Sequence, residues 1–354
     1  MSASTSPLVG VPEFELTIGN TAIAPALKAD IASVEVTEDV DMPAMLSVTL
    51  SLWDAQSQSL KEDYVTQFAL GTPLELAIGD SGTTIFTGEV TALEPEFGGF
   101  ERGDSLKVRA YNRLHRLQFG TYQRTFEKMT YSDIASSIAG ELGLTGAVDD
   151  SAVKHAHVAQ KNVSNLAFLL DLARPINYEV LVEDKTLHFR GIKAPRGPAV
   201  TLTYRQDLVE FTPRQRSVHE GAKVEVRGWD VKAKKAILGS AGAGDETSKM
   251  GGDDTGAELS AAAFASATRT VTREPVVDAD HATRIAKAAY NRQQSNFIEA
   301  QGECAGSTQI RAGNSVDIAG LGDAFSGTYY VVSATHTVGL DGYRTRFKVT
   351  RNAV

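Results

Sequence analysis

Short stretches in which apolar and polar residues alternate make up most of the chain. Residues 14–18 (FELTI) and 74–78 (LELAI) are typical of the first third, which runs to about Leu117. An alternation with period two places apolar side chains on one face of a β-strand and polar side chains on the other. Turn formers such as Gly19-Asn20 separate these stretches. The pattern predicts an antiparallel barrel over residues 10–118.

Between residues 119 and 198 the sequence changes to a helical period. Apolar residues recur every four positions behind Ser132, a candidate helix N-cap, and a second such stretch runs from Ser164 to the residue before Pro175. A proline ring ends a helix because it cannot continue the hydrogen-bond ladder. Residues 178–189 return to alternation, which predicts a hairpin. We therefore expect a small α+β domain in this segment.

Alternation resumes after residue 199 and again near the C-terminus. Residues 199–238 and 299–354 are predicted to form a second barrel. Between these segments, residues 239–260 are rich in Gly, Ser, Ala and Asp, which bury little surface, and residues 282–289 have a helical period. We expect residues 239–298 to be a flexible loop and a helix inserted into the second barrel.

The two predicted barrels share a sequence pattern. Gly71 precedes Leu-Glu-Leu-Ala at the same spacing at which Gly313 precedes Val-Asp-Ile-Ala, and two further matches follow in the same order at an offset of about 240 residues. The positions expected to be equivalent are Gly71, Phe86, Gly88 and Asn112 in the first barrel, and Gly313, Phe325, Gly327 and Asn352 in the second. The sequence thus predicts a mainly β (α+β) chain with two tandem, similar antiparallel β-barrel modules and an inserted α+β domain.

Charge and residue counts exclude several classes of protein. Thirty-five Lys and Arg against 44 Asp and Glu give a formal charge of −9, which argues against stable binding of nucleic acid. The sequence has no run of about 18 apolar residues, so membrane insertion is not expected. The single cysteine, Cys304, excludes an internal disulfide and a Cys-rich zinc site, which is typical of proteins made in the cytoplasm.

Residues that could carry catalysis lack the neighbours that such chemistry needs. The glycine-rich residues 239–244 are followed by two acids, which would repel a phosphate. His155 and His157 lack further ligands for a metal, and His336 lies in an alternating stretch typical of a barrel wall. We therefore assign no residue to catalysis, a cofactor or a metal, and we expect neither enzymatic activity nor a small-molecule substrate.

Three stretches of the sequence occur together in a recognisable order. They are residues 130–144, which begin TYSDIA, residues 158–174, which begin VAQKNVSNLAFLL, and residues 325–347, which run from FSGTYYVV to GYRTRF. Together they resemble the phage late-control D family, the baseplate hubs of contractile tails, which are similar to the N-terminal hub part of VgrG proteins. The resemblance covers most of residues 10–354.

The resemblance implies a structural role. Hubs of this kind are trimeric rings with two tube-like barrels per chain, so that six barrels face a hexameric inner tube protein. The further partners implied are a separate spike protein, because this chain stops at Val354 after its last strand, and baseplate wedge or tape-measure proteins. The chain would then be made in the cytoplasm and incorporated into the tail baseplate of a phage or phage-like particle.

A different class of function stays open from the sequence. A β-rich carbohydrate-binding or hydrolytic protein would use paired acids and exposed aromatic residues along a groove. Trp53 and Trp229 are the two tryptophans available for such a groove.

Overall fold

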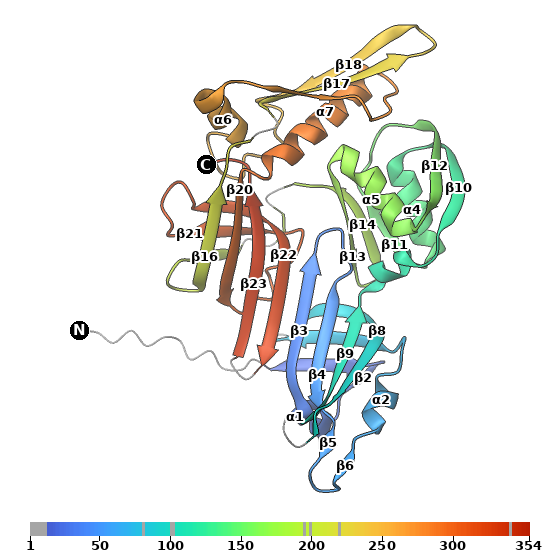
Figure 1. The fold of residues 1–354 in the computed structure, drawn as a ribbon, viewed down its shortest axis with the longest axis vertical. Coiled ribbons are helices and arrows are strands. Elements are labelled where there is room, and N and C mark those ends of the chain that lie inside the picture. The colour runs from blue at the N-terminus through green and yellow to red at the C-terminus, as the bar shows by residue number, and fades with distance from the viewer. Residues whose placement is uncertain are drawn as a thin grey trace, which may run out of the picture.

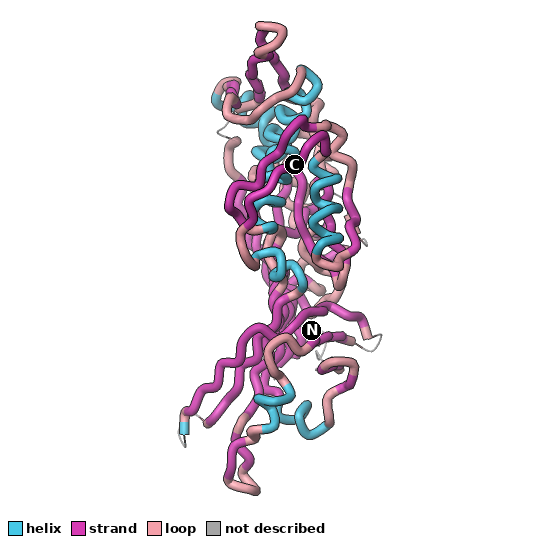
Figure 2. Tube along the Cα trace, turned by 90° about the vertical axis from the view of Figure 1, so that its right-hand side faces the viewer, coloured by secondary structure: helices cyan, strands magenta, loops and turns pink. Residues whose placement is uncertain are grey.

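The computed structural model describes residues 13–354 apart from 80–81, 100–102, 194–195, 198–199, 219–220 and 340–341. Residues 10–12, the start of the predicted first barrel, lie outside this range. Two β modules follow one another along an elongated molecule, and two inserted units stand at its upper end (Figure 1). The view turned by 90° shows the helices of the inserted units in the upper half of the molecule (Figure 2).

The first module is a curled antiparallel sheet with strand order β3-β4-β9-β8-β7-β1-β2. Its core joins strands from both ends of this order, because Leu16 of β1, Leu46 of β4 and Leu76 of β7 belong to one buried cluster. Short helices and a small hairpin lie in the connections between its strands. The elements are β1 (Phe14–Ile18), β2 (Thr21–Ala22), α1 (Pro25–Asp30), β3 (Ile31–Asp39), β4 (Met45–Ser51), β5 (Trp53–Asp54), β6 (Ser59–Leu60), α2 (Asp63–Gln67), β7 (Pro73–Ile78), β8 (Thr83–Phe97) and β9 (Asp104–Tyr111).

The second module has the strand order β16-β20-β23-β22-β21-β15. A second buried cluster forms its core and includes Phe297, Val331 and Val349. Its elements are β15 (Thr201–Thr203), β16 (Leu208–Gln215), β20 (Ile298–Ala305), β21 (Ser315–Ala319), β22 (Gly327–Gly339) and β23 (Gly342–Arg351).

The two modules have matching strand orders. The series β3-β4-β9-β8-β7 corresponds to β16-β20-β23-β22-β21, and every neighbouring pair in both series is antiparallel. The β-bulges match as well: register shifts occur at Ala32 in β3 and Val209 in β16, and at Thr91 in β8 and Val332 in β22. The described residues of the two modules differ in two places: β8 has a further register shift at Ile85 in its pairing with β7 that β22 lacks, and β1 is antiparallel to β7 whereas β15 is parallel to β21. Matching order and matching bulges confirm the predicted pair of similar modules.

The inserted α+β domain follows the first module as predicted. Its elements are η1 (Arg113–Gln118), β10 (Tyr122–Met129), α4 (Tyr131–Glu141), β11 (Thr145–Val148), β12 (His155–Val163), α5 (Asn165–Ala173), η2 (Arg174–Ile176), β13 (Tyr178–Glu183) and β14 (Thr186–Gly191). Ser164 caps α5. The cap of α4 is Thr130 rather than Ser132, because Thr130 and Asp133 form a capping box that satisfies two backbone N–H groups.

The second inserted unit begins earlier than the sequence predicts. Its elements are β17 (Lys223–Asp230), β18 (Lys235–Ala241), α6 (Gly256–Phe264), β19 (Thr268–Val271) and α7 (Ala279–Gln294). Strands β17, β18 and β19 form a separate sheet on which α7 packs, so residues 223–238 do not belong to the second barrel. The close packing uses Gly239, where a Cβ atom would lie 2.3 Å from the backbone of α7. The mobility of residues 239–260 stays a prediction; they contain the capping box of Thr255 and Glu258 at the start of α6.

Candidate functional site

The two modules are joined edge to edge into one sheet. The second half of β22 pairs with β3 over six residue pairs, from Ser333 opposite Asp39 to Val338 opposite Val34. The first half of β22 pairs with β21, just as the first half of β8 pairs with β7. Strands β16-β20-β23-β22-β3-β4-β9-β8 therefore form a continuous antiparallel series that runs across both modules (Figure 1).

A part-buried ion pair holds this joint. Arg311 donates from Nε to Oε2 of Glu38 at 2.8 Å, pairs through Nη2 with the other carboxylate oxygen, and donates from Nη2 to the carbonyl of Ile85 at 2.9 Å. Glu38 is 8% exposed. Burial disfavours the charge on Arg311, but the Glu38 carboxylate outweighs this, so the pKa of Arg311 is raised. The pair thus ties the segment between β20 and β21 to strand β3 of the first module.

A buried histidine lies in the same joint. His336 of β22 is opposite Val36 of β3 and is 1% exposed. Its Nδ1 lies 2.9 Å from the hydroxyl of Tyr343 and 3.2 Å from that of Thr345. Burial lowers the pKa of His336 to about 4. This places His336 in a wall between the modules, as the alternation predicts, and not at a solvent-accessible catalytic position.

The joint is expected to weaken in acid because of His336. A histidine in the unfolded chain has a pKa of about 6.5, whereas folded His336 has a pKa of about 4. The folded state therefore binds this proton less well than the unfolded state does. The resulting contribution to the free energy of unfolding is fully present above about pH 6.5 and is lost as the pH falls towards 4. The expected loss is about 3 kcal/mol, measurable by urea unfolding at about pH 7 and about pH 4. The variant His336→Leu is expected to reduce this difference.

The matched control is His157→Leu, at an exposed position of β12. It is expected to keep the acid sensitivity of the parent chain. His155, whose pKa burial also lowers to about 4, contributes a similar dependence that His336→Leu leaves in place. An unchanged difference between the two pH values in His336→Leu would contradict the assignment.

Side chains at the ends of β9 and β23 hold the inserted units. Asn112 donates from Nδ2 to the carbonyl of Val182 at 2.9 Å, and Asn352 donates from Nδ2 to that of Ser248 at 2.6 Å.

A buried group of Glu179, Arg190 and Tyr330 adds a contact between β13, β14 and β22, with 2.7 Å between Arg190 Nε and Glu179 Oε1 and a short hydrogen bond from Tyr330. Burial raises the pKa of Glu179 despite these partners.

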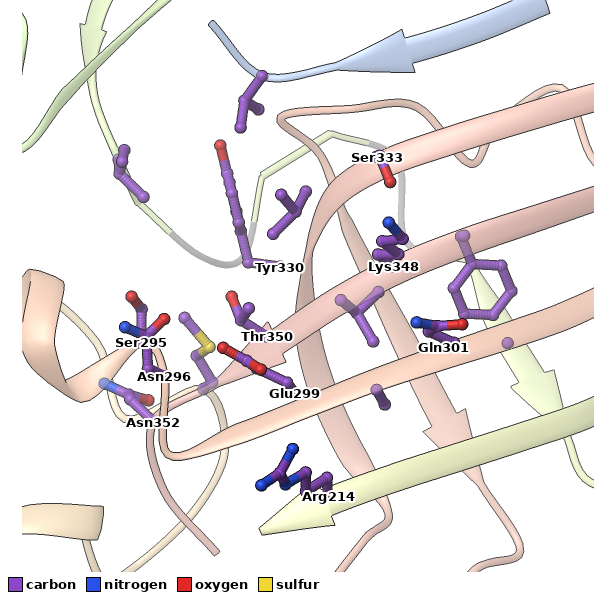
Figure 3. A pocket seen from close by; sticks show the side chains of 18 of the residues that line it. Arg214, Ser295, Asn296, Glu299, Gln301, Tyr330, Ser333, Lys348, Thr350 and Asn352 are labelled. Carbon is purple, nitrogen blue, oxygen red and sulfur yellow. The ribbon is translucent and has the colours of Figure 1, made fainter. Parts of the chain in front are cut away.

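A cavity of about 1030 Å³ lies between the sheet of the second module and the inserted units. Its floor is the polar face of β16, β20 and β23, where Arg214, Glu299, Gln301 and Lys348 project into it (Figure 3). Ser295 and Asn296, which follow α7, close one side. The lining mixes acids, bases and amides. Among the described residues no group of three His, Cys, Asp or Glu side chains is arranged to hold a metal ion.

The turn glycines of the predicted repeat have the same local structure. Gly71 and Gly313 have φ angles of 83° and 82°, a left-handed conformation that favours glycine. The N–H of Gly71 donates to the carbonyl of Val90 at 2.8 Å, and the N–H of Gly313 donates to that of Val331 at 2.9 Å. Both acceptors immediately precede the matching bulges of β8 and β22.

The other predicted pairs do not share a register position. In the first module, Gly88 lies opposite Leu74 and Phe86 lies opposite Leu76. In the second module, Gly327 lies opposite Ile318, the residue equivalent to Leu76. Gly327 therefore occupies the position of Phe86 and not that of Gly88. Phe86 is buried in β8, but Phe325 lies in the turn before β22 and is only partly buried. The shared Phe-x-Gly motif is therefore two residues out of register between the modules.

Residues considered for other chemistry lie apart from one another. His155 stacks on Tyr131, with 4.2 Å between the ring centroids, and lies edge-on to His281 of α7, with 5.2 Å between the centroids. It therefore links the two inserted units. Cys304 is buried in the second core, where burial raises the pKa of its thiol to about 12. Trp53 and Trp229 are 40% and 60% exposed, on β5 and β17, which lie at opposite ends of the molecule (Figure 1). No single groove can contain both tryptophans.

Sequence reasoning missed the pair of Glu38 and Arg311. One signal was available, because Glu38 follows Val34 and Val36 at an inward position of an alternating strand. A carboxylate at such a position needs a partner. Its identity was not readable, since Arg311 lies in a distant part of the chain.

Comparison with solved structures places the fold among tail proteins. The 43 kDa tail protein of prophage MuSo2 from Shewanella oneidensis is 12% identical, with a TM-score of 0.70 over 96% of this chain and 98% of that one. A tail protein from Neisseria meningitidis is 12% identical, with a TM-score of 0.66 over 97% of both chains. An E. coli component of the type VI secretion system, described as structurally similar to the T4 bacteriophage tail proteins gp27 and gp5, is 12% identical, with a TM-score of 0.62 over 96% of this chain and 77% of that one.

At 12% identity these likenesses concern the fold, which is a tail-protein fold. No curated protein matches the sequence. Within the part of the chain that the structure describes, no helix is long and apolar enough to span a bilayer. A family model, the Alg8 N-terminal domain, matches residues 10–339. The chain therefore belongs to the Alg8 N-terminal domain family.

Proposed function

We propose that this protein is a structural baseplate hub of a contractile tail or contractile injection system. In this role three copies form a ring that joins a hexameric inner tube to a trimeric spike made by a separate polypeptide, as in late-control D and VgrG hubs. The ring acts mechanically and through its interfaces, and not as an enzyme. It is made in the cytoplasm and enters a phage-like particle, where wedge or tape-measure proteins are further partners.

The matching strand order of the two modules is the observation that carries this proposal. A trimer of chains that each contain two similar modules presents six similar surfaces to a six-fold partner and keeps three-fold symmetry for another. The edge-to-edge joint of β22 and β3 supports it further, because it shows how one module continues the sheet of another. The fold shared with tail proteins agrees with the same role.

The carbohydrate-binding alternative gains no support from the site. Its aromatic platforms, Trp53 and Trp229, lie on separate elements at opposite ends of the molecule.

The first test is the mass of the intact chain in solution. We expect a concentration-dependent assembly of about 114 kDa, three times the 37.9 kDa of one chain, measured by light scattering on a sizing column. The assembly should look like a ring with six lobes in electron micrographs. A chain that stays monomeric at its highest soluble concentration, alone and with the tube protein from the same gene cluster, would count against the hub.

A further inference from the structure

The continuous sheet ends in two unpaired strand edges. At one end, residues 92–97 of β8 pair with β9 on one side, and on the other side no described residue pairs with them. At the other end, residues 210–215 of β16 pair with β20, and no described residue pairs with their second edge. We refer to these segments as the β8 edge and the β16 edge. An unpaired edge presents backbone N–H and C=O groups that can pair with another chain.

The two edges are the counterparts of the two strands that meet inside the chain. The strand orders equate β8 with β22 and β16 with β3, and β22 pairs with β3. The matching bulges set the register, because they align Ala92 with Ser333 and Glu210 with Ser33. The β8 edge of one chain can therefore meet the β16 edge of another in the way that β22 meets β3.

Transferring the internal register to the two edges brings complementary residues together. Val338 opposite Val34 becomes Phe97 opposite Phe211, and Thr335 opposite Thr37 becomes Glu94 opposite Arg214. The first is an aromatic pair on the core side of the sheet and the second an opposite-charge pair on the polar side, both of which stabilise antiparallel neighbours.

Apolar side chains are buried at the internal joint, whereas an equivalent side chain on a free edge is exposed. Val338 and Val34 are 2% and 1% exposed, whereas their counterpart on the β8 edge, Phe97, is 66% exposed. Phe211 is partly buried against the second core and packs edge-on against Tyr329 at 5.5 Å. A large exposed aromatic side chain beside an unpaired edge is typical of a surface that another chain covers.

Prolines at both edges restrict which strand can pair there. Pro95 and Pro213 pair with Leu106 and Ala300 although neither has an N–H, so the missing donor at each site points to the free edge. The transferred register puts these two prolines opposite each other, in the place of His336 and Val36. In the internal joint, His336 and Val36 form a hydrogen-bonded pair, because Val40 donates to the carbonyl of Val332 and such pairs alternate along antiparallel strands. The joint between two copies therefore lacks the two hydrogen bonds of the proline pair and keeps those of the pairs two positions away, Leu93 with Gln215 and Phe97 with Phe211.

We propose that the β8 edge of one copy pairs with the β16 edge of the next copy in the same register as β22 with β3, so that three copies close into one ring. This contact is head-to-tail, since each chain contributes one edge of each kind, and such contacts close when the rotation per chain permits it. The inference rests on the proposed hub function and adds the residues through which neighbouring chains meet.

The experiment uses cysteine pairs in the full-length chain. Glu96 and Thr212 take the places of Thr337 and Glu35 and face each other in the proposed joint. Directly opposed residues in an antiparallel sheet are close enough for a disulfide, whereas residues two positions further along are not. The variant Glu96→Cys/Thr212→Cys is compared with the out-of-register control Glu96→Cys/Arg214→Cys. The native Cys304 is buried and does not compete.

After mild oxidation, a denaturing gel without reductant should show linked dimers and trimers for Glu96→Cys/Thr212→Cys and mostly monomer for the control. If the chain forms trimers by light scattering but the Glu96→Cys/Thr212→Cys variant does not link, the edge joint is wrong and the ring has another interface. If neither trimers nor links form at any concentration, both the joint and the trimeric hub are overturned.

A charge exchange tests the register without cysteines. Glu94, which in the free chain lies 2.9 Å from Arg109, is replaced by arginine and Arg214 by glutamate. Each single variant, Glu94→Arg or Arg214→Glu, should raise the concentration needed for trimer formation by about tenfold or more, because like charges then face each other. The double variant should restore assembly. Glu127→Arg, on an exposed position of β10, is the control and should assemble normally. Failure of the double variant to recover would contradict the register.

Discussion

Replacing Arg311 by alanine is expected to lower the free energy of unfolding by about 2–4 kcal/mol. The substitution leaves the Glu38 carboxylate almost without solvent and without its cation, and it also removes the donor to the carbonyl of Ile85. Urea unfolding followed by fluorescence at neutral pH measures the change. Because this pair lies at the joint, the two modules are also expected to lose cooperativity.

The matched control is Arg216→Ala, which removes an ion pair with 2.5 Å between Arg216 Nη2 and Glu299 Oε1. The side chains of Arg216 and Glu299 are 37% and 44% exposed. An exposed pair contributes little, so the expected loss is below about 1 kcal/mol. Equal losses in the two variants would show that Glu38 finds water or another partner when Arg311 is removed.

Replacing Gly88 by alanine is expected to lower the free energy of unfolding by about 1–3 kcal/mol. A Cβ atom at Gly88 would lie 2.3 Å from the carbonyl oxygen of Tyr111 and 2.5 Å from the ring of Phe86, so the backbone of β8 or β9 must move. Gly88 pairs with Leu74 of β7, and the next residue, Glu89, pairs with Tyr111 of β9. Thermal unfolding of the purified variant gives the effect.

Gly140→Ala provides the comparison at an open position. Gly140 lies near the end of α4, and a Cβ atom there meets nothing within 4 Å. Alanine restricts the unfolded chain and favours the helix, so this variant is expected to gain about 0.4–1 kcal/mol. A Gly88→Ala variant as stable as the parent would mean that β8 can separate from β9 at this point without cost.

The sequence predicts the modules and most local elements because these depend on neighbours in the chain. Ser164 before an apolar stripe located α5, and the alternation of residues 178–189 located the hairpin of β13 and β14. Strand β17 was assigned to the wrong unit, because its alternation is the same whether it joins the barrel or packs on α7. Only the long-range contact with α7 distinguishes the two.

Register and partner choice were beyond the sequence pattern for a related reason. Phe86 and Phe325 share a motif, but Phe86 lies in the ladder opposite Leu76, whereas Phe325 lies in the turn before β22. Nine residues separate Leu76 from Phe86, and eight separate the equivalent pair Ile318 and Gly327, so the position of the motif does not give the register. The joint between the modules could not be predicted from the sequence either. Strand β22 pairs with β3, which comes from the opposite end of the chain, and Arg311 pairs with the equally distant Glu38.

Both inserted units leave the sheet at the same end of its strands. The α+β domain follows Tyr111, the last residue of β9, and the second unit follows Gln215, which lies opposite Ile298 and hence level with Arg351. The hairpins of β8 with β9 and of β22 with β23 turn at the other end. A closed ring of such chains would therefore have two different rims. One rim would carry the two kinds of inserted unit in alternation, and the other rim would carry the same hairpin in every module. The tube and the spike could then distinguish the two rims before either partner is bound.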